Sequence, residues 1–153
     1  MDESASLRRD WQRWTTAVFL FGVGFAIYGG VFQNFLRERL RADELGLGTL
    51  ESMREIPGLL TALTMVTLVA LAESRVAAIG LLVTGVGIAV SGVTANIPQA
   101  VAVAMFWSVG FHLYSTMSSP ITLALAKGQE GGRHLGRMQG VGGWATILGL
   151  GLA

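Results

Sequence analysis

The stretch IPQAVAVAMFWSVGFHLYSTMSSPITLALA, residues 97–126, decides the fold of this chain. A helix of that length, at about 1.5 Å per residue, measures about 45 Å, which exceeds the ~30 Å hydrocarbon thickness of a bilayer. An imidazole, His112, lies at the centre of the run, and a basic, glycine-rich segment from Lys127 to Arg137 follows it. We therefore predict a transmembrane helix that carries a polar group at mid-depth.

The composition of the whole chain agrees with a membrane protein. Of its 153 residues, 52% are hydrophobic and only 14% are charged, whereas about a quarter of the residues of a soluble domain are charged. The net charge of +1 leaves no basic excess for nucleic acid, and the absence of cysteine excludes disulfides and thiolate chemistry. We predict an all-α integral membrane protein whose surroundings are membrane lipid.

Apolar runs separated by short charged clusters divide the chain into helices. We predict a cytoplasmic N-terminal segment at residues 1–14 and spans over about residues 15–36, 48–72, 76–93, 97–126 and 138–153. The last is shorter than the ~20 residues that a span requires. In the first span, Gly22, Ala26 and Gly30 recur every fourth residue, and such a stripe is expected to pack against another helix. Pro57 should bend the second span, because proline removes a backbone donor.

The distribution of lysine and arginine predicts the orientation, because these residues accumulate on the cytoplasmic side. Seven lie on the side of the N-terminus: Arg8, Arg9, Arg13, Arg75, Lys127, Arg133 and Arg137. Four lie on the other side: Arg37, Arg39, Arg41 and Arg54. We therefore expect a multi-pass protein of the plasma (inner) membrane with a cytoplasmic N-terminus.

Two segments of the first half recur in the second half. VGFAIY at residues 23–28 returns as VGFHLY at 109–114, and LGTLE at 47–51 as LGRMQ at 135–139, offsets of 86 and 88 residues. Because the copies lie three spans apart, the second would cross the membrane in the opposite direction, as in the inverted repeats of secondary transporters. Coincidence between glycine-rich apolar segments is the alternative. The two repeats would cover residues 15–93 and 97–153.

The C-terminal part of the chain resembles the cytoplasmic loop and fifth helix of major facilitator superfamily transporters, on residues 132–133 (GR), 135–143 (LGRMQGVGG) and 148–151 (LGLG). The link after the second span occupies the place of that family's Gly-x-Leu-Ala-Asp-Arg-x-Gly-Arg-Arg signature. Here residues 69–76 read VALAESRV, in which only Leu71 and Ala72 match and Glu73 replaces the aspartate. A charge relay of the family's kind would therefore rest on Glu73 and Arg75.

The resemblance implies a function. A family member is a secondary active transporter that moves a small solute by alternating access, here with proton coupling as the expectation. The first, second, fourth and fifth helices would line the path, and the third would pack outside. Because the family has about twelve spans, this chain would be an N-terminal portion that lacks a C-terminal half. The alternative is a structural or partner-binding membrane protein that does not transport.

The second span holds three charged residues, Glu51, Arg54 and Glu55. A charged side chain at the centre of a bilayer costs roughly 2.5 to 3.5 kcal/mol on insertion scales, so one that is retained there points to function. Glu51 and Glu55 lie one turn apart, and Arg54 can pair with Glu51 at i, i+3. We predict that these three groups contact a proton or an ionic solute; the alternative is a salt-bridged helix end near the membrane surface.

The candidates on the fourth span centre on His112. It can take a proton near physiological pH, and Trp107 and Tyr114 accompany it in a segment that also contains Ser115, Thr116, Ser118 and Ser119. The alternative for His112 is an interhelical hydrogen bond that only packs the bundle. Further candidates lie on the first span, where capping or interfacial anchoring is the alternative: Tyr28, Gln33 and Asn34.

Other chemistry is not expected. His112 and His134 differ too much in depth to share a metal, and no zinc-type spacing of ligands occurs. The segment from Gly128 to Gly143 lacks the order of a phosphate-binding loop. Arg133, His134 and Arg137 are expected to face lipid headgroups or a loop. We predict no enzyme activity, no metal and no cofactor.

Overall fold

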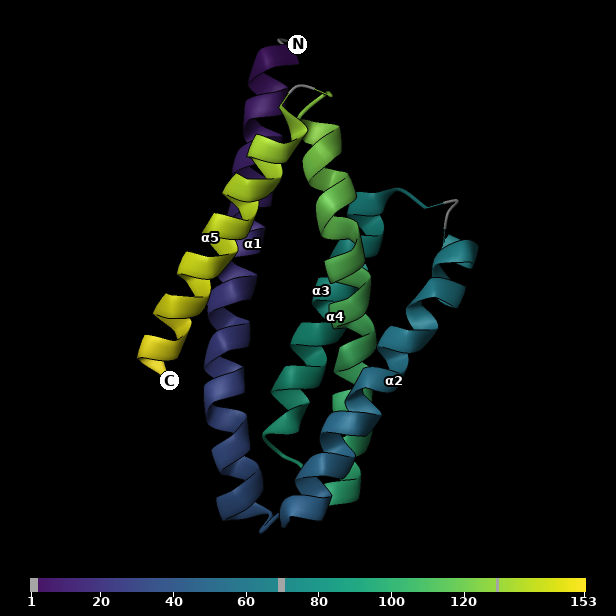
Figure 1. Ribbon diagram of the computed structural model, residues 1–153, viewed down its shortest axis with the longest axis vertical. Helices are drawn as coiled ribbons and strands as arrows, with labels where there is room; N and C mark the ends of the chain where they lie inside the picture. The colour runs from purple at the N-terminus through teal and green to yellow at the C-terminus, as the bar shows by residue number, and fades with distance from the viewer. Residues whose placement is uncertain (1–2, 69–70, 129) are drawn as a thin grey trace. The chain divides into compact units, whose positions relative to one another are not determined.

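A computed structural model describes residues 3–68, 71–128 and 130–153, and for residues 62–68 the backbone alone. These residues form α-helices and no strand (Figure 1). The elements are α1 (Glu3–Asn34), the π-helical segment η1 (Phe35–Arg39), α2 (Glu44–Leu68), α3 (Glu73–Ser91), α4 (Ile97–Leu125) and α5 (Gly131–Leu152). The prediction of an all-helical protein is confirmed.

Three helical stretches are long and apolar enough to cross a membrane, namely Glu3–Arg39, Glu73–Ser91 and Ile97–Ala126. They correspond to three of the five predicted spans and support a membrane protein. The helices α2 and α5 are not among them within the described residues. In α2 the charged residues Glu51, Arg54 and Glu55 precede the apolar stretch, whose continuation at residues 69–70 lies outside the described residues. Helix α5 combines frequent glycine with two arginines.

The helices extend beyond the apolar runs. Helix α1 begins at Glu3, within the predicted N-terminal segment, and α5 begins at Gly131 rather than near Met138. In α1 the added residues include alanine, leucine and arginine, which favour a helix. The first turns of α5 contain Gly131, Gly132 and Gly136, so helix propensity does not explain its early start. Helix α4 begins at Ile97 as predicted. There the Asn96 side chain accepts the Gln99 N–H at 3.0 Å, which satisfies a donor of the first turn.

The chain folds as two compact units, residues 1–31 with 119–153 and residues 32–118. The boundaries fall inside α1 and inside α4, so each of these helices contributes to both units. The first unit therefore consists of most of α1, the end of α4 and α5. The second consists of the end of α1, η1, α2, α3 and most of α4.

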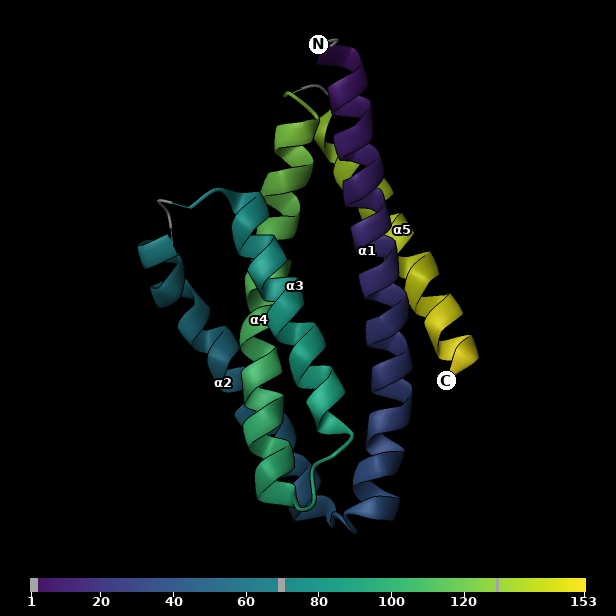
Figure 2. The same cartoon turned by 180° about the vertical axis from the view of Figure 1, so that it is seen from behind.

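The first unit is held together by small residues between α1 and α5, which run side by side (Figure 2). A Cβ atom added at Gly149 would lie 2.5 Å from the Val23 carbonyl oxygen and 2.7 Å from the Ala26 Cβ. One added at Gly22 would lie 2.8 Å from the Ala145 Cβ. Such distances allow no side chain, so the two backbones meet directly. The predicted packing of the stripe on α1 is confirmed, with α5 as its partner.

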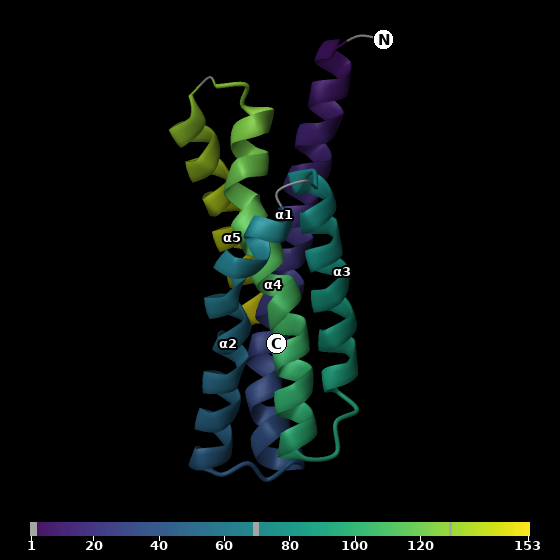
Figure 3. The same cartoon turned by 90° about the vertical axis from the view of Figure 1, so that its right-hand side faces the viewer.

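The second unit has a similar contact between α3 and α4, which lie side by side in Figure 3. A Cβ atom added at Gly110 would lie 2.5 Å from the Gly80 carbonyl oxygen and 2.6 Å from the Thr84 nitrogen. The buried Thr84 hydroxyl donates to the Gly80 carbonyl at 2.8 Å and lies 3.4 Å from the Trp107 carbonyl oxygen. Because this contact holds one face of α4 against α3, the opposite face of α4 is directed away from α3.

One ion pair in the first unit joins distant parts of the chain outside the apolar segments. Lys127 follows α4 and binds the carboxylate of Glu3 in the first turn of α1. The hydrogen bond and charge of Lys127 lower the pKa of Glu3 below its usual value. The stability from this pair is therefore present above the ordinary pKa of glutamate and is lost as the pH falls through the lowered one. Because both side chains are exposed, the contribution is small.

Candidate functional site

Three charged residues of α2, Glu51, Arg54 and Glu55, form a connected group in the second unit. One guanidinium nitrogen of Arg54 lies 2.6 Å from a Glu51 carboxylate oxygen and 3.3 Å from a Glu55 oxygen. Arg54 is the most covered of the three, with 30% of its side chain exposed, against 39% for Glu51 and 59% for Glu55. One cation thus bridges two carboxylates; its contact with Glu51 follows the predicted i, i+3 spacing, whereas the contact with the adjacent Glu55 was not predicted.

Residues from two other helices complete the surroundings of Arg54. Gln33, near the end of α1, donates its amide N–H to Glu51 at 3.0 Å. The Arg54 guanidinium carbon lies 5.6 Å from the ring centre of Trp107 on α4. That indole is buried, and a cation over an aromatic face gains more attraction when water is excluded. The arginine is therefore held by carboxylates within α2 and by an aromatic ring of α4.

A backbone contact joins α2 and α4 at the same level. Pro57 lies inside α2 and removes the N–H that would otherwise reach the Met53 carbonyl. In the same turn the Arg54 carbonyl accepts a hydrogen bond of 2.5 Å from the Ser108 hydroxyl. Hydroxyl side chains commonly satisfy backbone groups near proline in membrane helices. Ser108 thereby sets the register between the two helices.

His112 lies one turn beyond Ser108 on α4 and faces the acidic end of the group. Its Nε2 atom is 3.8 Å from a Glu55 carboxylate oxygen, and 22% of its side chain is exposed. The ring occupies space left by Gly58, since a Cβ atom there would lie 2.5 Å from the Cε1 atom and 2.6 Å from the Nε2 atom of His112. The residue after Pro57 must therefore be small for the imidazole to approach Glu55.

Replacing Gly58 by alanine is expected to displace the imidazole from Glu55, because the new methyl group would overlap the ring. Of the two histidines in the chain, only the His112 ring should move. Two-dimensional NMR of ring-labelled protein in micelles should therefore show a changed His112 resonance and an unchanged His134 resonance. Gly48→Ala on the same helix is the control, because nothing lies within 4 Å of that position. An unchanged His112 signal in Gly58→Ala would contradict this geometry.

The charge balance of the group suggests its chemistry. With a neutral imidazole, two carboxylates and one guanidinium leave a formal charge of −1 (−2 + 1), and a proton on His112 brings the sum to zero. The largely exposed Glu55 side chain lies beside the half-buried imidazole.

The structure brings together six of the nine residues predicted for the pathway, namely Gln33, Glu51, Arg54, Glu55, Trp107 and His112. The other three lie elsewhere. Tyr114 is buried where α4 approaches Gly80 of α3. Asn34 is exposed at the end of α1. Tyr28 belongs to the first unit, where its ring lies beside Phe25.

The motif-like residues of the second connection are also outside the group. Glu73 and Arg75 lie exposed in the first turn of α3. The structure shows no ion pair for either within the residues that it describes. Of the hydroxyl residues after Tyr114, Ser115 and Thr116 are exposed. The proposed relay at this connection stays a prediction.

Sequence reasoning missed Gly58 and Ser108. A signal for Ser108 was present, because it precedes His112 by four residues and so lies on the same face of α4. Gly58 had no such signal, since a glycine after proline is compatible with many helix contacts. Among the residues that the structure describes, no group of three or more histidine, cysteine or acidic side chains could hold a metal ion.

Comparisons with protein families, with characterised proteins and with solved structures found no match to this chain. The chemistry of the site is therefore argued from its own geometry.

Proposed function

We propose that this chain is a secondary active transporter, or the N-terminal portion of one, that moves a small solute by alternating access and couples it to protons. The observation that carries the proposal is the approach of His112 to Glu55, 3.8 Å apart, beside the Arg54 bridge. We propose the major facilitator superfamily as its class, on the sequence resemblance described above, with the plasma (inner) membrane as its location and the N-terminus in the cytoplasm.

Energetics support a functional reading of the group. Charges placed in a membrane helix cost insertion free energy, and well-packed apolar residues would avoid that cost. This chain instead keeps four ionisable side chains and one glutamine in contact, on three helices of a largely apolar protein. Scaffolding alone does not need them, because the glycine contacts of α3 with α4 and of α1 with α5 already join helices.

In the proposed cycle, a proton on His112 neutralises the group and a solute binds beside Glu55. Arg54 would then shift toward Glu51 or toward Glu55, depending on the charge of the bound solute. Deprotonation restores the net charge of −1 and favours release. The inverted repeats proposed for residues 15–93 and 97–153 would supply the rocking motion, against a facing lobe formed by further helices or another chain.

The test is proton movement across proteoliposomes that contain the full chain and an entrapped pH-sensitive dye. Panels of sugars, amino acids, organic anions and organic cations are added outside, under an inward proton gradient. We expect at least one panel to accelerate acidification of the lumen above that of protein-free vesicles. A chain that inserts correctly but accelerates acidification with none of the panels would contradict coupled transport and favour the structural or partner-binding alternative.

A further inference from the structure

Two adjoining hollows lie between α1 and α5 in the first unit. The first has a volume of about 560 Å³ and is lined by Thr15, Thr16, Phe19, Arg137, Gly140, Val141 and Trp144. The second measures about 430 Å³ and is lined by Arg8, Trp11, Gln12, Thr15, Thr16 and Arg137. Because three lining residues are common to both, the hollows form one groove along the two helices. We call it the α1–α5 groove.

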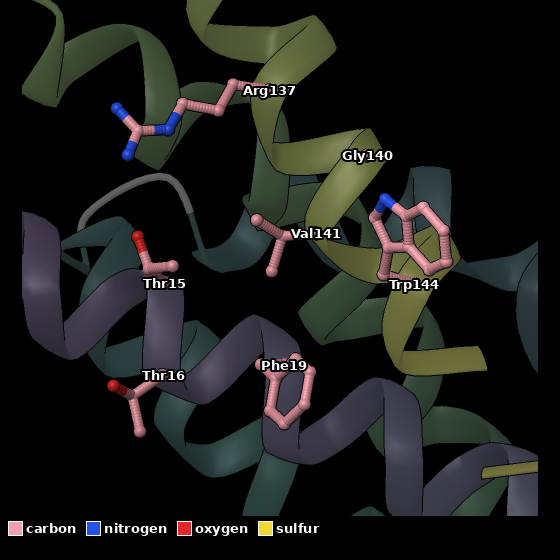
Figure 4. A pocket seen from close by; sticks show the side chains of 7 residues that line it. All are labelled: Thr15, Thr16, Phe19, Arg137, Gly140, Val141 and Trp144. Carbon is pink, nitrogen blue, oxygen red and sulfur yellow. The ribbon is translucent and has the colours of Figure 1, made fainter. Parts of the chain in front are cut away.

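The groove is polar at one end and apolar at the other. Figure 4 shows Arg137 near Thr15, whereas Trp144 extends from α5 beyond Phe19. The polar end, in the second hollow, adds Arg8, Gln12 and the indole of Trp11. The apolar end leads to Trp144, which is 72% exposed, and to the exposed Ile147. A ligand that fills the groove needs an anionic or hydrogen-bonding head joined to an apolar chain.

Three cations of the first unit have an acidic partner, whereas Arg9 and the two arginines of the groove show none within the described residues. Arg13 pairs with Asp10, Lys127 with Glu3 and Arg133 with Glu130. The structure shows no ion pair for Arg8 or Arg137 within the part of the chain that it describes, and no acidic side chain lines either hollow. Two uncompensated guanidinium groups thus meet at the polar end, where a phosphate would be complementary in charge and geometry.

We infer that the α1–α5 groove binds an anionic glycerophospholipid. Its phosphate would lie between Arg8 and Arg137 with Thr15 and Gln12 as hydrogen-bonding groups, and one acyl chain would lie along Phe19, Val141 and Trp144. The amphipathic rings of Trp11 and Trp144 suit the boundary between headgroups and hydrocarbon. The apolar end selects a lipid over a soluble phosphate, which would leave that end uncovered. This inference does not depend on the proposed transport.

Fluorescence quenching of Trp144 measures the binding. The full chain is reconstituted in bilayers of phosphatidylcholine. A fixed fraction of the lipid carries brominated acyl chains, and this brominated lipid is either phosphatidylglycerol or phosphatidylcholine. Bromine quenches indole fluorescence on contact. We expect phosphatidylglycerol to bind about fivefold more tightly than phosphatidylcholine for each arginine that contacts it. This factor corresponds to the attraction between one basic residue and an anionic membrane surface. The headgroup-selective quenching should disappear in Trp144→Phe.

Substitutions of single arginines show whether lipid selectivity comes from the α1–α5 groove or from the positive charge of the surface in general. Arg137→Gln and Arg8→Gln should each lower the preference for phosphatidylglycerol about fivefold, and Arg137→Lys should retain most of it. Arg9→Gln is the matched control, because it removes the same charge from a residue beside Arg8 that does not line the groove. An equal loss in Arg9→Gln, no preference in the unmodified chain, or selective quenching that persists in Trp144→Phe would each overturn the inference.

A soluble competitor distinguishes the two sources of phosphate. Excess glycerol phosphate or inorganic phosphate should leave the selective quenching unchanged, because neither supplies an acyl chain for the apolar end. Full displacement of the brominated phosphatidylglycerol by either anion would overturn the assignment to a lipid and identify a soluble phosphate site.

Discussion

Replacing His112 by glutamine is expected to remove most of the solute-driven proton movement in proteoliposomes that contain the full chain. Glutamine retains hydrogen-bonding capacity but cannot be protonated, so the group would keep its charge of −1 throughout. Glu55→Gln should act similarly, because it removes the partner that lies 3.8 Å from the imidazole. We expect a decrease in initial rate of at least about tenfold, which corresponds to about 1.4 kcal/mol in the activation barrier.

Two control substitutions change the same residue types outside the group. Glu44→Gln neutralises an exposed carboxylate in the first turn of α2, and His134→Gln removes the imidazole that stacks on Trp11 in the first unit. Both should retain the rate of the unmodified chain. If His112→Gln and Glu55→Gln also retain it, the assignment of the proton site to this pair is wrong, even if the chain transports.

The second large effect concerns stability. Gly110→Ala is expected to destabilise the second unit by about 1 to 3 kcal/mol, the usual cost of overpacking. The added methyl group would meet the Gly80 carbonyl oxygen at 2.5 Å and the Thr84 nitrogen at 2.6 Å. Both are backbone atoms, so the helices must separate to relieve the overlap. The separation would also lengthen the contact between the Thr84 hydroxyl and the Trp107 carbonyl.

Unfolding in micelles by increasing fractions of sodium dodecyl sulfate, followed by circular dichroism, measures this effect. Gly85→Ala is the matched control on α3, because nothing lies within 4 Å of that position and alanine favours a helix by up to about 1 kcal/mol over glycine. Its unfolding midpoint should be equal to or above that of the unmodified chain. Equal midpoints for Gly110→Ala and Gly85→Ala would contradict the close contact between α3 and α4.

Part of the candidate site follows from local spacing, and part does not. The pairing of Arg54 with Glu51 depends on residues within one turn of one helix, so the sequence predicts it. The approach of His112 to Glu55 joins residues on two different helices. It depends on the space at Gly58, which no local pattern indicates. Tyr114 is only two residues from His112 in the sequence, yet it lies outside the group.

The sequence alone determined that this chain forms long apolar helices. Helix formation depends on hydrogen bonds within each segment and on the length of its apolar run, both of which are local properties. Only the tertiary structure decided which faces meet. On α3, Gly80 and Gly87 are buried against α4, whereas Gly85 is exposed, although all three are glycines in one apolar run. Which glycine makes a contact depends on the partner helix, and only packing brings that partner to it.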